Sequence, residues 1–281
     1  MFVRQLIEEN SAQLTQSERK LAAVLLSDYP FAGLASIQEL AGRADVSAPS
    51  ISRFVTKIGL TGYPELQRRL IVEMREGNRS PVDIHETATK IEGGFLAGFL
   101  DRAVEQVQSA GDAITEAQFQ RICALLSDPR RDIYALGGRI SDTIAVQLTF
   151  HLRQAREGVF HLHRDSETWP EYLLRMRAGD VLFLVDFRRY QANLLALAKK
   201  AAERKVQVVL MTDKWLSPVT RHAAEVLAVP IDTHTIWDSY SAALAVTEAL
   251  ATQVGELDWS ATRERIEAWD AARQFDKETP P

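Results

Sequence analysis

The sequence predicts an all-α head followed by an α/β body whose parallel sheet has helices on both faces. Residues 1–77 show apolar residues at helical spacing throughout. From residue 133 onward, apolar runs of strand length alternate with helical segments, which is typical of a parallel sheet covered on both faces. The length of 281 residues suits two domains. We expect the head at 1–77, a helical linker at 78–111, the body at 112–256, and a C-terminal helix and tail at 257–281.

Four helices are predicted in the head. Thr15 followed by Glu18 has the spacing of a capping box, so a helix begins there. Shorter helices are expected at 36–44 and 47–58, and a fourth begins near residue 63. Asp45 lies in the turn between the two short helices, where glycine is common. Aspartate tolerates the positive φ of such a turn better than most residues do.

The body is predicted to contain five strands that alternate with helices. The strands are expected at 133–136, 159–163, 180–187, 206–213 and 225–231. The helices between and after them are expected at 141–156, 168–177, 190–204 and 238–255. An amphipathic helix follows, with Ile266 and Trp269 on its apolar side, and the final residues "KETPP" are expected to fray.

Composition narrows the classes of protein that the chain can represent. The net charge is −5, but residues 1–80 carry +1 and the remainder −6, so the head is the less acidic part. The single cysteine, Cys123, forms no intrachain disulfide and no cysteine-based zinc site. There is no apolar stretch typical of a signal peptide or a membrane span, so we expect a cytoplasmic protein that does not bind membranes.

Residues 36–58 have the spacing of a helix-turn-helix motif. In the second helix, one apolar stripe is formed by Ile51, Val55 and Ile58. The opposite, polar stripe is formed by Ser50, Arg53 and Lys57, which suits a helix that contacts DNA bases and phosphates. The pattern alone equally fits a helical dimerisation bundle whose exposed face carries two cations.

The body contains a strand, a glycine loop and a helix start in succession, an arrangement that can hold a phosphate. Gly137 and Gly138 follow the first strand, and Ser141 precedes the helix. Arg139, Arg188 and Arg189 come at the carboxyl ends of strands, where open α/β sheets bind ligands. Their guanidinium groups can hold an anion. Alternatively, they pair with Asp142, Asp186 or Glu171 or line a subunit interface.

The head resembles that of the RpiR-type bacterial transcriptional regulators. The resemblance covers "SERKLAAVLLSD…SIQELAGRADVSAPSISRFVTKIGLTGYPELQRRL". It implies that the helix from Ser47 to Lys57 enters the major groove of double-stranded operator DNA. The DNA-binding residues would be Ser47, Pro49, Ser50, Arg53 and Lys57, with Tyr63 and Arg68 contacting phosphates.

The body is similar to the sugar isomerase (SIS) domain that follows the head in this family. Such domains hold a phosphate in two loops, which here are Gly137, Gly138, Arg139 and Ser141 in the first and Asp186, Arg188 and Arg189 in the second. The second loop lacks the usual serines, glycine and threonine, and Arg139 replaces a glycine in the first. Ser217, in a "TDKWLSP" segment that matches a family landmark, completes the expected ligand site.

Catalysis is not expected, because no glutamate lies in a recognisable loop for an isomerase base, the usual phosphate loop is absent, and a DNA-binding head is attached. His161 and His163 could share a strand face and suit a metal, but we interpret them as polar residues at a strand end and expect no metal site and no cofactor. The leading hypothesis is a regulator that binds an operator as a homodimer or homotetramer and senses a small anionic metabolite, such as a sugar phosphate or a sugar acid. A sugar-phosphate isomerase with an appended helical domain is the alternative. A constitutive DNA-binding protein whose body only dimerises is a third hypothesis.

Overall fold

The computed structural model describes residues 2–273, and the chain folds into two compact units. The first unit consists of Met1–Arg79 together with Trp215–Arg221, and the second of Ser80–Lys214 together with His222–Pro281. The predicted fraying tail begins beyond the described residues. Within the described part, no helix is long and apolar enough to cross a membrane.

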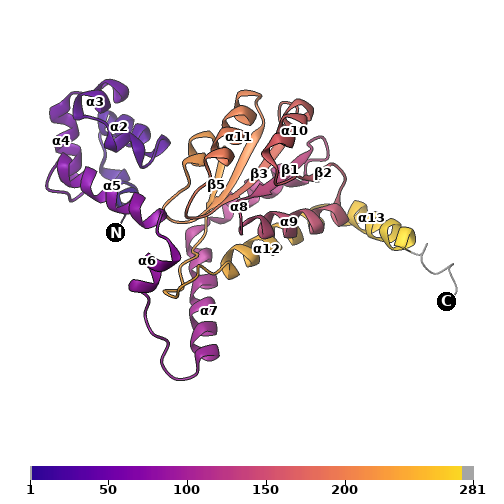
Figure 1. Ribbon diagram of the computed structural model, residues 1–281. Helices are drawn as coiled ribbons and strands as arrows, with labels where there is room; N and C mark the ends of the chain where they lie inside the picture. Colours follow the sequence, from indigo (N-terminus) through magenta and orange to yellow (C-terminus); the bar gives the residue numbers. More distant parts are fainter. Residues whose placement is uncertain (1, 274–281) are drawn as a thin grey trace. The chain divides into compact units, whose positions relative to one another are not determined.

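The first unit is a helical head, as predicted (Figure 1). Its α-helices are α1 (Val3–Glu9), α2 (Gln16–Ser27), α3 (Ile37–Ala44), α4 (Ala48–Lys57) and α5 (Tyr63–Gly77). The Thr15 hydroxyl caps α2 in a capping box with Glu18, which confirms that predicted start. Asp45 has a φ of 52° in the turn between α3 and α4, also as expected. Side chains of the predicted inner stripe of α4, Ile51 and Val55, are completely buried.

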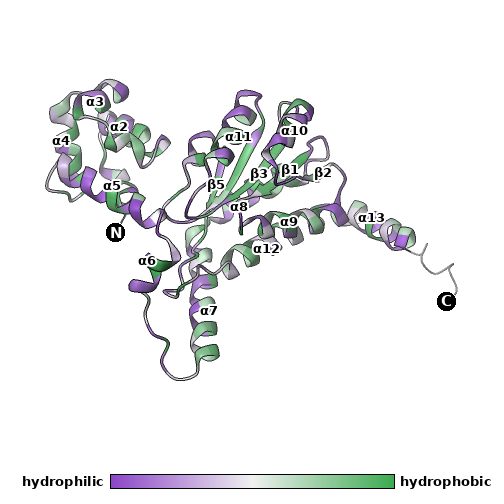
Figure 2. Cartoon of the chain, viewed as in Figure 1, coloured by the Kyte–Doolittle hydropathy of each residue, from purple (hydrophilic) through white to green (hydrophobic). Residues whose placement is uncertain are grey.

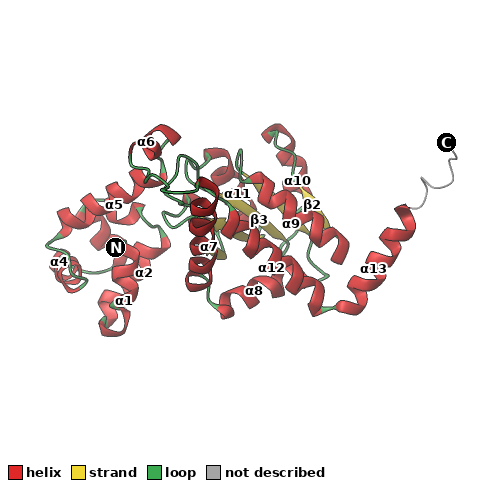
Figure 3. Cartoon of the chain, turned by 90° about the horizontal axis from the view of Figure 1, so that it is seen from below, coloured by secondary structure: helices red, strands yellow, loops and turns green. Residues whose placement is uncertain are grey.

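The second unit is built on one parallel sheet with the strand order β2-β1-β3-β4-β5. The strands are β1 (Ile133–Gly137), β2 (Val159–His161), β3 (Val181–Asp186), β4 (Gln207–Thr212) and β5 (Glu225–Ala228). The helices are α6 (Pro81–Glu86), α7 (Phe95–Ala113), α8 (Glu116–Ser127), α9 (Asp142–Ala155), α10 (Trp169–Arg175), α11 (Ala192–Glu203), α12 (Ser241–Leu257) and α13 (Trp259–Ala272). Helices α9 and α12 cover one face of the sheet, and α10 and α11 cover the other (Figures 1 and 3). The predicted fold class is therefore confirmed.

The core of the second unit is the sheet itself. Every residue of β1 and β3 is buried, which explains their continuous apolar sequences (Figure 2). The strand order indicates where the candidate site lies. The connection after β1 leads to β2 on one side of β1, and the connection after β2 leads to β3 on its other side. The crevice at the carboxyl ends of β1 and β3 is thus the topological switch point, where open α/β sheets bind ligands.

Candidate functional site

The start of α4 presents a polar cluster to solvent. The Ser47 hydroxyl accepts a hydrogen bond from the Ser50 amide at 3.3 Å and lies 2.8 Å from the Ser50 hydroxyl. The Arg53 guanidinium donates to the Ser50 hydroxyl at 3.2 Å, and its side chain is exposed. Pro49 is exposed beside them, and Arg68 is exposed on α5. These predicted residues are therefore available to a DNA duplex.

Two of the predicted DNA-binding residues are engaged inside the head. The Lys57 ammonium donates to the Gln13 carbonyl at 3.2 Å and to the Glu18 carboxylate at 2.6 Å. It thereby holds the end of α4 against the start of α2, but it stays exposed, so its DNA contact stays a prediction. Tyr63 is buried, and its hydroxyl donates to the carbonyl of Ala35 at 2.9 Å, so it orders the head instead of contacting a phosphate.

Ser52 and Thr56 are exposed residues of α4 that the sequence analysis missed. Their hydroxyls donate to helix carbonyls, at 3.4 Å to Ala48 and 3.1 Å to Ser52. They lie four residues apart and so share one face of α4, which adjoins the stripe of Ser50, Arg53 and Lys57. Widening the polar stripe by one row would have identified them.

Two backbone amides of the first loop donate hydrogen bonds to side chains of the same loop. The Gly137 amide donates to the Asp142 carboxylate at 2.8 Å, and the Gly138 amide donates to the Ser141 hydroxyl at 2.9 Å. Ser141 in turn donates to the Val185 carbonyl of β3 at 2.8 Å. A Cβ atom on Gly137 would lie 2.5 Å from the Asp142 nitrogen, so this position requires glycine. The amides of Gly137 and Gly138 and the hydroxyl of Ser141 are therefore already engaged within the protein.

Asp142 is the buried anchor of this loop. Its carboxylate lies 2.8 Å from His161 Nε2 and accepts a hydrogen bond from Arg164 Nε at 2.9 Å. Burial opposes ionisation of Asp142, but the hydrogen bonds from His161, Arg164 and Gly137 outweigh it and lower its pKa. His161 is thus engaged by a carboxylate, and the His163 ring accepts from the Asp165 amide at 3.2 Å. This agrees with the interpretation of both histidines as polar residues at a strand end.

Arg188, which the sequence predicts as an anion ligand, lies inside a group of carboxylates that already engage it. Only 2% of its side chain is exposed, and its nitrogens lie 3.7 Å from Asp232 and 3.4 Å from Asp238. Its backbone amide donates to the Asp213 carboxylate at 2.6 Å. The Tyr190 hydroxyl donates to the other oxygen of Asp213 at 2.7 Å. Sequence analysis considered ion pairing for Arg188, but with other partners.

Two aspartates of this part of the crevice, Asp186 and Asp238, are shielded from solvent. Asp186 is 1% exposed, and its carboxylate accepts a hydrogen bond from the Gln191 amide at the start of α11 at 3.3 Å. Burial raises the pKa of Asp238 to about 6, while Arg188 lowers it and the neighbouring Asp213 and Asp232 raise it further. Two aspartates face the Arg188 guanidinium, and Lys214 also lowers the pKa of both, so the inner crevice already carries its own anions.

We expect Asp238→Asn to change how stability depends on pH. The folded-state pKa of about 6 exceeds the ordinary value of 3.8, so the folded protein binds the Asp238 proton more tightly than the unfolded chain does. This stabilisation is complete below the ordinary pKa and is lost as pH rises through the folded-state pKa. At ~1.36 kcal/mol per pKa unit, the loss amounts to about 3 kcal/mol. Denaturant titrations should show that, from pH 4 to pH 7, the free energy of unfolding of Asp238→Asn rises relative to that of the wild type by about this amount. Parallel pH profiles for the two proteins would contradict the assignment.

Three exposed arginines form a rim around the crevice. Arg164 follows β2, Arg139 follows β1 and Arg189 follows β3, and these strands are neighbours in the sheet. The side chain of Arg164 is 58% exposed, and its guanidinium also donates to the Arg139 carbonyl at 3.0 Å. Arg189 has a φ of 68°, which turns the chain sharply after Arg188. We call Arg139, Arg164 and Arg189 the arginine rim.

Arg164 was missed by the sequence analysis, although the rule that selected Arg139 applies to it equally. It follows an apolar strand and lies at the carboxyl edge of the same sheet. Ser217 is placed differently from the expectation. It is completely buried, its hydroxyl accepts from the Val219 amide at 3.2 Å, and its segment Trp215–Arg221 belongs to the first unit.

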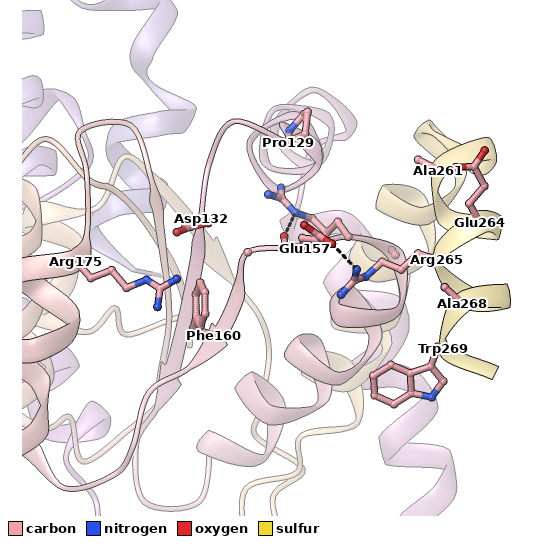
Figure 4. A pocket seen from close by; sticks show the side chains of 13 residues that line it. Pro129, Asp132, Glu157, Phe160, Arg175, Ala261, Glu264, Arg265, Ala268 and Trp269 are labelled. Carbon is pink, nitrogen blue, oxygen red and sulfur yellow. Dashed lines mark hydrogen bonds and ion pairs between the residues drawn. The ribbon is translucent and has the colours of Figure 1, made fainter. Parts of the chain in front are cut away.

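A separate cavity of about 900 Å³ lies at the opposite, amino-terminal edge of β1 and β2 (Figure 4). Its arginines already have protein partners. Arg156 donates to the carbonyls of Leu126 and Asp128 at 2.7 and 2.9 Å, and Arg265 of α13 pairs with Glu157 at 3.2 Å. A third lining arginine, Arg175, lies over the Phe160 ring at 4.1 Å. The cavity is therefore a seam between α13 and the body whose arginines are engaged by the protein.

Comparison with known proteins identifies both units. Residues 1–77 match the model of the helix-turn-helix domain of the rpiR family, and residues 125–253 match the SIS domain. The chain belongs to the RpiR type of regulator. Two curated relatives are transcriptional regulators named HexR. The HexR of Pseudomonas aeruginosa is 25% identical over 261 residues, covering 88% of this chain and 87% of the relative. The HexR of Escherichia coli is 25% identical over 254 residues, covering 88% and 85%.

Solved structures share the fold of this RpiR-type chain. The sugar isomerase domain of an RpiR transcription factor from Sphaerobacter thermophilus has a TM-score of 0.59 at 19% identity, covering 63% of this chain and 98% of that one. The NanR protein of Vibrio vulnificus, solved in complex with ManNAc-6P, has a TM-score of 0.56 at 17% identity and covers 99% of both chains. The family and its named relatives support a regulator and not an enzyme, as predicted.

Proposed function

We propose that this RpiR-type regulator binds double-stranded operator DNA through α4 and senses a small anionic metabolite, such as a sugar phosphate or a sugar acid, at the arginine rim. The observation that carries the ligand proposal is the rim itself. Three exposed guanidinium groups follow three neighbouring strands at the switch point. Guanidinium groups bind carboxylates and phosphates with paired hydrogen bonds. The sugar phosphate in the related NanR structure supports the same class of ligand.

The proposed ligand binds at the rim and not at the buried Arg188. Since Asp232 and Asp238 already match the charge of Arg188, a second anion beside it would meet several carboxylates. Those carboxylates suit a different part of the ligand, because they accept hydrogen bonds from hydroxyl groups. An anionic group at the rim and hydroxyl groups toward Asp186 and Asp238 would together select a polyhydroxy anion.

DNA binding is proposed to require a homodimer or a homotetramer. Heads of this kind bind two half-sites about one helical turn apart when two copies are held together. We propose that α7 of the second unit, much of which is coloured as hydrophobic in Figure 2, supplies an apolar surface for this contact. The exposed apolar residues of α7 are Phe95, Leu96, Leu100, Val104 and Val107. Exposed apolar surface of this kind is typical of protein–protein contacts.

The DNA-binding part of the proposal predicts a loss of affinity in Arg53→Ala. If Arg53 contacts a base edge, the variant should lose roughly 1–3 kcal/mol of specific binding. The measurement is the dissociation constant at fixed salt for a duplex that the wild type selects from its own genomic DNA. Arg68→Ala is the matched control, because loss of a phosphate contact should weaken binding evenly across sequences and flatten its salt dependence. Unchanged operator affinity in Arg53→Ala would exclude the base contact.

A further inference from the structure

The loop between β5 and α12 closes one side of the crevice. Asp232 and Asp238, near its two ends, both face the Arg188 guanidinium, at 3.7 and 3.4 Å. Both carboxylates are largely buried, with 23% and 19% of their side chains exposed. The charge of Arg188 therefore holds both ends of this loop, which we call the clamp loop (residues 232–238).

The tip of the clamp loop is tied to the linker that leads from the head. Arg102 of α7 donates to the carbonyls of Thr233 and His234 at 3.0 and 3.1 Å. The same guanidinium donates to the carbonyls of Thr89 and Lys90 at 3.2 and 3.4 Å. The Thr89 amide donates directly to the His234 carbonyl at 3.0 Å. One arginine thus joins four carbonyls from two segments that are far apart in the sequence.

The clamp loop is held together by contacts within it and at its base. Ile231, just before it, and Thr233 are 1% and 2% exposed, so the loop is anchored in the core on one side. The Thr233 and Thr235 hydroxyls lie 3.0 Å apart, and at the base the Ser239 amide donates to the Ile231 carbonyl at 2.8 Å. Because these bonds tie the loop together, a displacement at its aspartates would be passed to the carbonyls of Thr233 and His234.

Arginine is the side chain that this junction requires. Its planar guanidinium carries five N–H donors in a fixed fork, and carbonyl oxygens from two segments can be held at once. A lysine would keep the charge but would lose the fork geometry. The bond to the Thr233 carbonyl is partly buried, so losing it would cost free energy, whereas the other three bonds are exposed and water can replace them.

We propose that Arg102 is the positioning residue that couples the sensing crevice to the linker carrying the DNA-binding head. Hydroxyl groups of a ligand held at the rim reach Asp238 and compete with Arg188 for its carboxylate, which weakens the hold of Arg188 on the clamp loop. The clamp loop then shifts, and Arg102 and the Thr89 amide transmit the shift to the residues after α6. A ligand can move this equilibrium only by its difference in affinity for the two arrangements. This inference rests on the proposed function for its biological meaning.

The junction itself can be tested without metabolite or DNA. Hydrogen exchange of the full-length protein reports on the Thr89 amide, whose partner is the clamp loop. Asp238→Asn serves as an internal trigger, because it removes one carboxylate from Arg188. We expect it to speed exchange in peptides covering residues 87–92 by about tenfold, the equivalent of one or two weakened hydrogen bonds. Arg102→Gln should produce a similar increase by itself.

The decisive measurement is the double variant. If the coupling runs through Arg102, Asp238→Asn should add less than about a twofold increase in exchange when Arg102→Gln is already present. Arg102→Lys, which keeps the charge, should behave like Arg102→Gln and provides a second variant should the latter fold poorly. Arg121→Gln is the matched control on the adjoining helix α8, because Arg121 pairs with Glu225 far from the linker, and the Asp238 effect should persist in it.

Fully additive effects of the two substitutions would overturn the coupling, as would an unchanged linker in Asp238→Asn. The two proposals fail separately in this design. Loss of operator binding or of anion binding would count against the proposed function, whereas the exchange experiment measures only the connection between the clamp loop and the linker. When both hold, Arg102→Gln should bind inorganic phosphate like the wild type. Its operator affinity should respond at least fivefold less than that of the wild type to a phosphosugar that releases the wild type from DNA.

Discussion

Arg188→Ala should lower the free energy of unfolding of the second unit by about 3–5 kcal/mol, because it leaves a buried group of carboxylates without its cation. Asp232 and Asp238 lose their ion pair, and Asp186 and Asp213 remain nearby. Tryptophan fluorescence during denaturant unfolding reports mainly on this unit, which contains the residues Trp169, Trp237, Trp259 and Trp269. The loss should be larger at pH 7 than at pH 5, since protonation relieves Asp238 at lower pH.

The neighbouring residue provides a matched control for this prediction. Arg189 has the same side chain, but it is exposed and belongs to the arginine rim. Arg189→Ala should change stability by less than about 0.5 kcal/mol, as is usual for exposed positions. Equal unfolding midpoints for the Arg188 and Arg189 variants would show that the carboxylates do not depend on Arg188. Adjacent arginines with such different effects would confirm that one is structural and the other is free for a ligand.

The fold was accessible from the sequence because its signals are local. Capping at Thr15 and Ser47 and the positive φ at Asp45 depend on residues a few positions apart. The buried strands β1 and β3 appear as uninterrupted apolar runs for the same reason. Boundaries were less exact where strands end in polar residues, as at β2, which ends at His161 and not at residue 163.

The candidate site was only partly accessible, because its ion pairs join residues that are distant in the sequence. Arg188 meets Asp232 and Asp238, which lie beyond two further strands, and Lys57 meets Glu18, 39 residues earlier. A sequence identifies an arginine at a strand end but does not show whether a carboxylate from another segment reaches it first. Arg164 could have been predicted from the sequence, because it follows β2 just as Arg139 follows β1.

The arginine rim should account for most of the response to an anionic ligand. A hydrogen bond to a charged group contributes about 1.5–3 kcal/mol, so Arg139→Ala and Arg164→Ala should each weaken binding of the anion by roughly 10- to 100-fold. The double variant should show almost no ligand-dependent release of operator DNA. Binding is measured first with inorganic phosphate and then with a series of phosphosugars and sugar acids. A wild-type protein at 100 times the dissociation constant gains about 2.7 kcal/mol of stability, which a thermal-shift assay detects readily.

Two controls separate a ligand site from a general effect of charge. Arg130→Ala removes an arginine that is 84% exposed and pairs with Asp128 before β1, at the opposite edge of the sheet, so it should leave anion binding unchanged. Arg164 also contacts Asp142, so Arg164→Ala could act by loosening the first loop. Arg139→Ala avoids this difficulty, because the exposed Arg139 side chain can be removed while the Asp142 contacts remain in place.

If both single variants weaken phosphate binding while Arg130→Ala does not, the anion is held by the rim. If ligand-dependent stabilisation persists in the double variant, these arginines are surface residues and the effector binds elsewhere in the crevice.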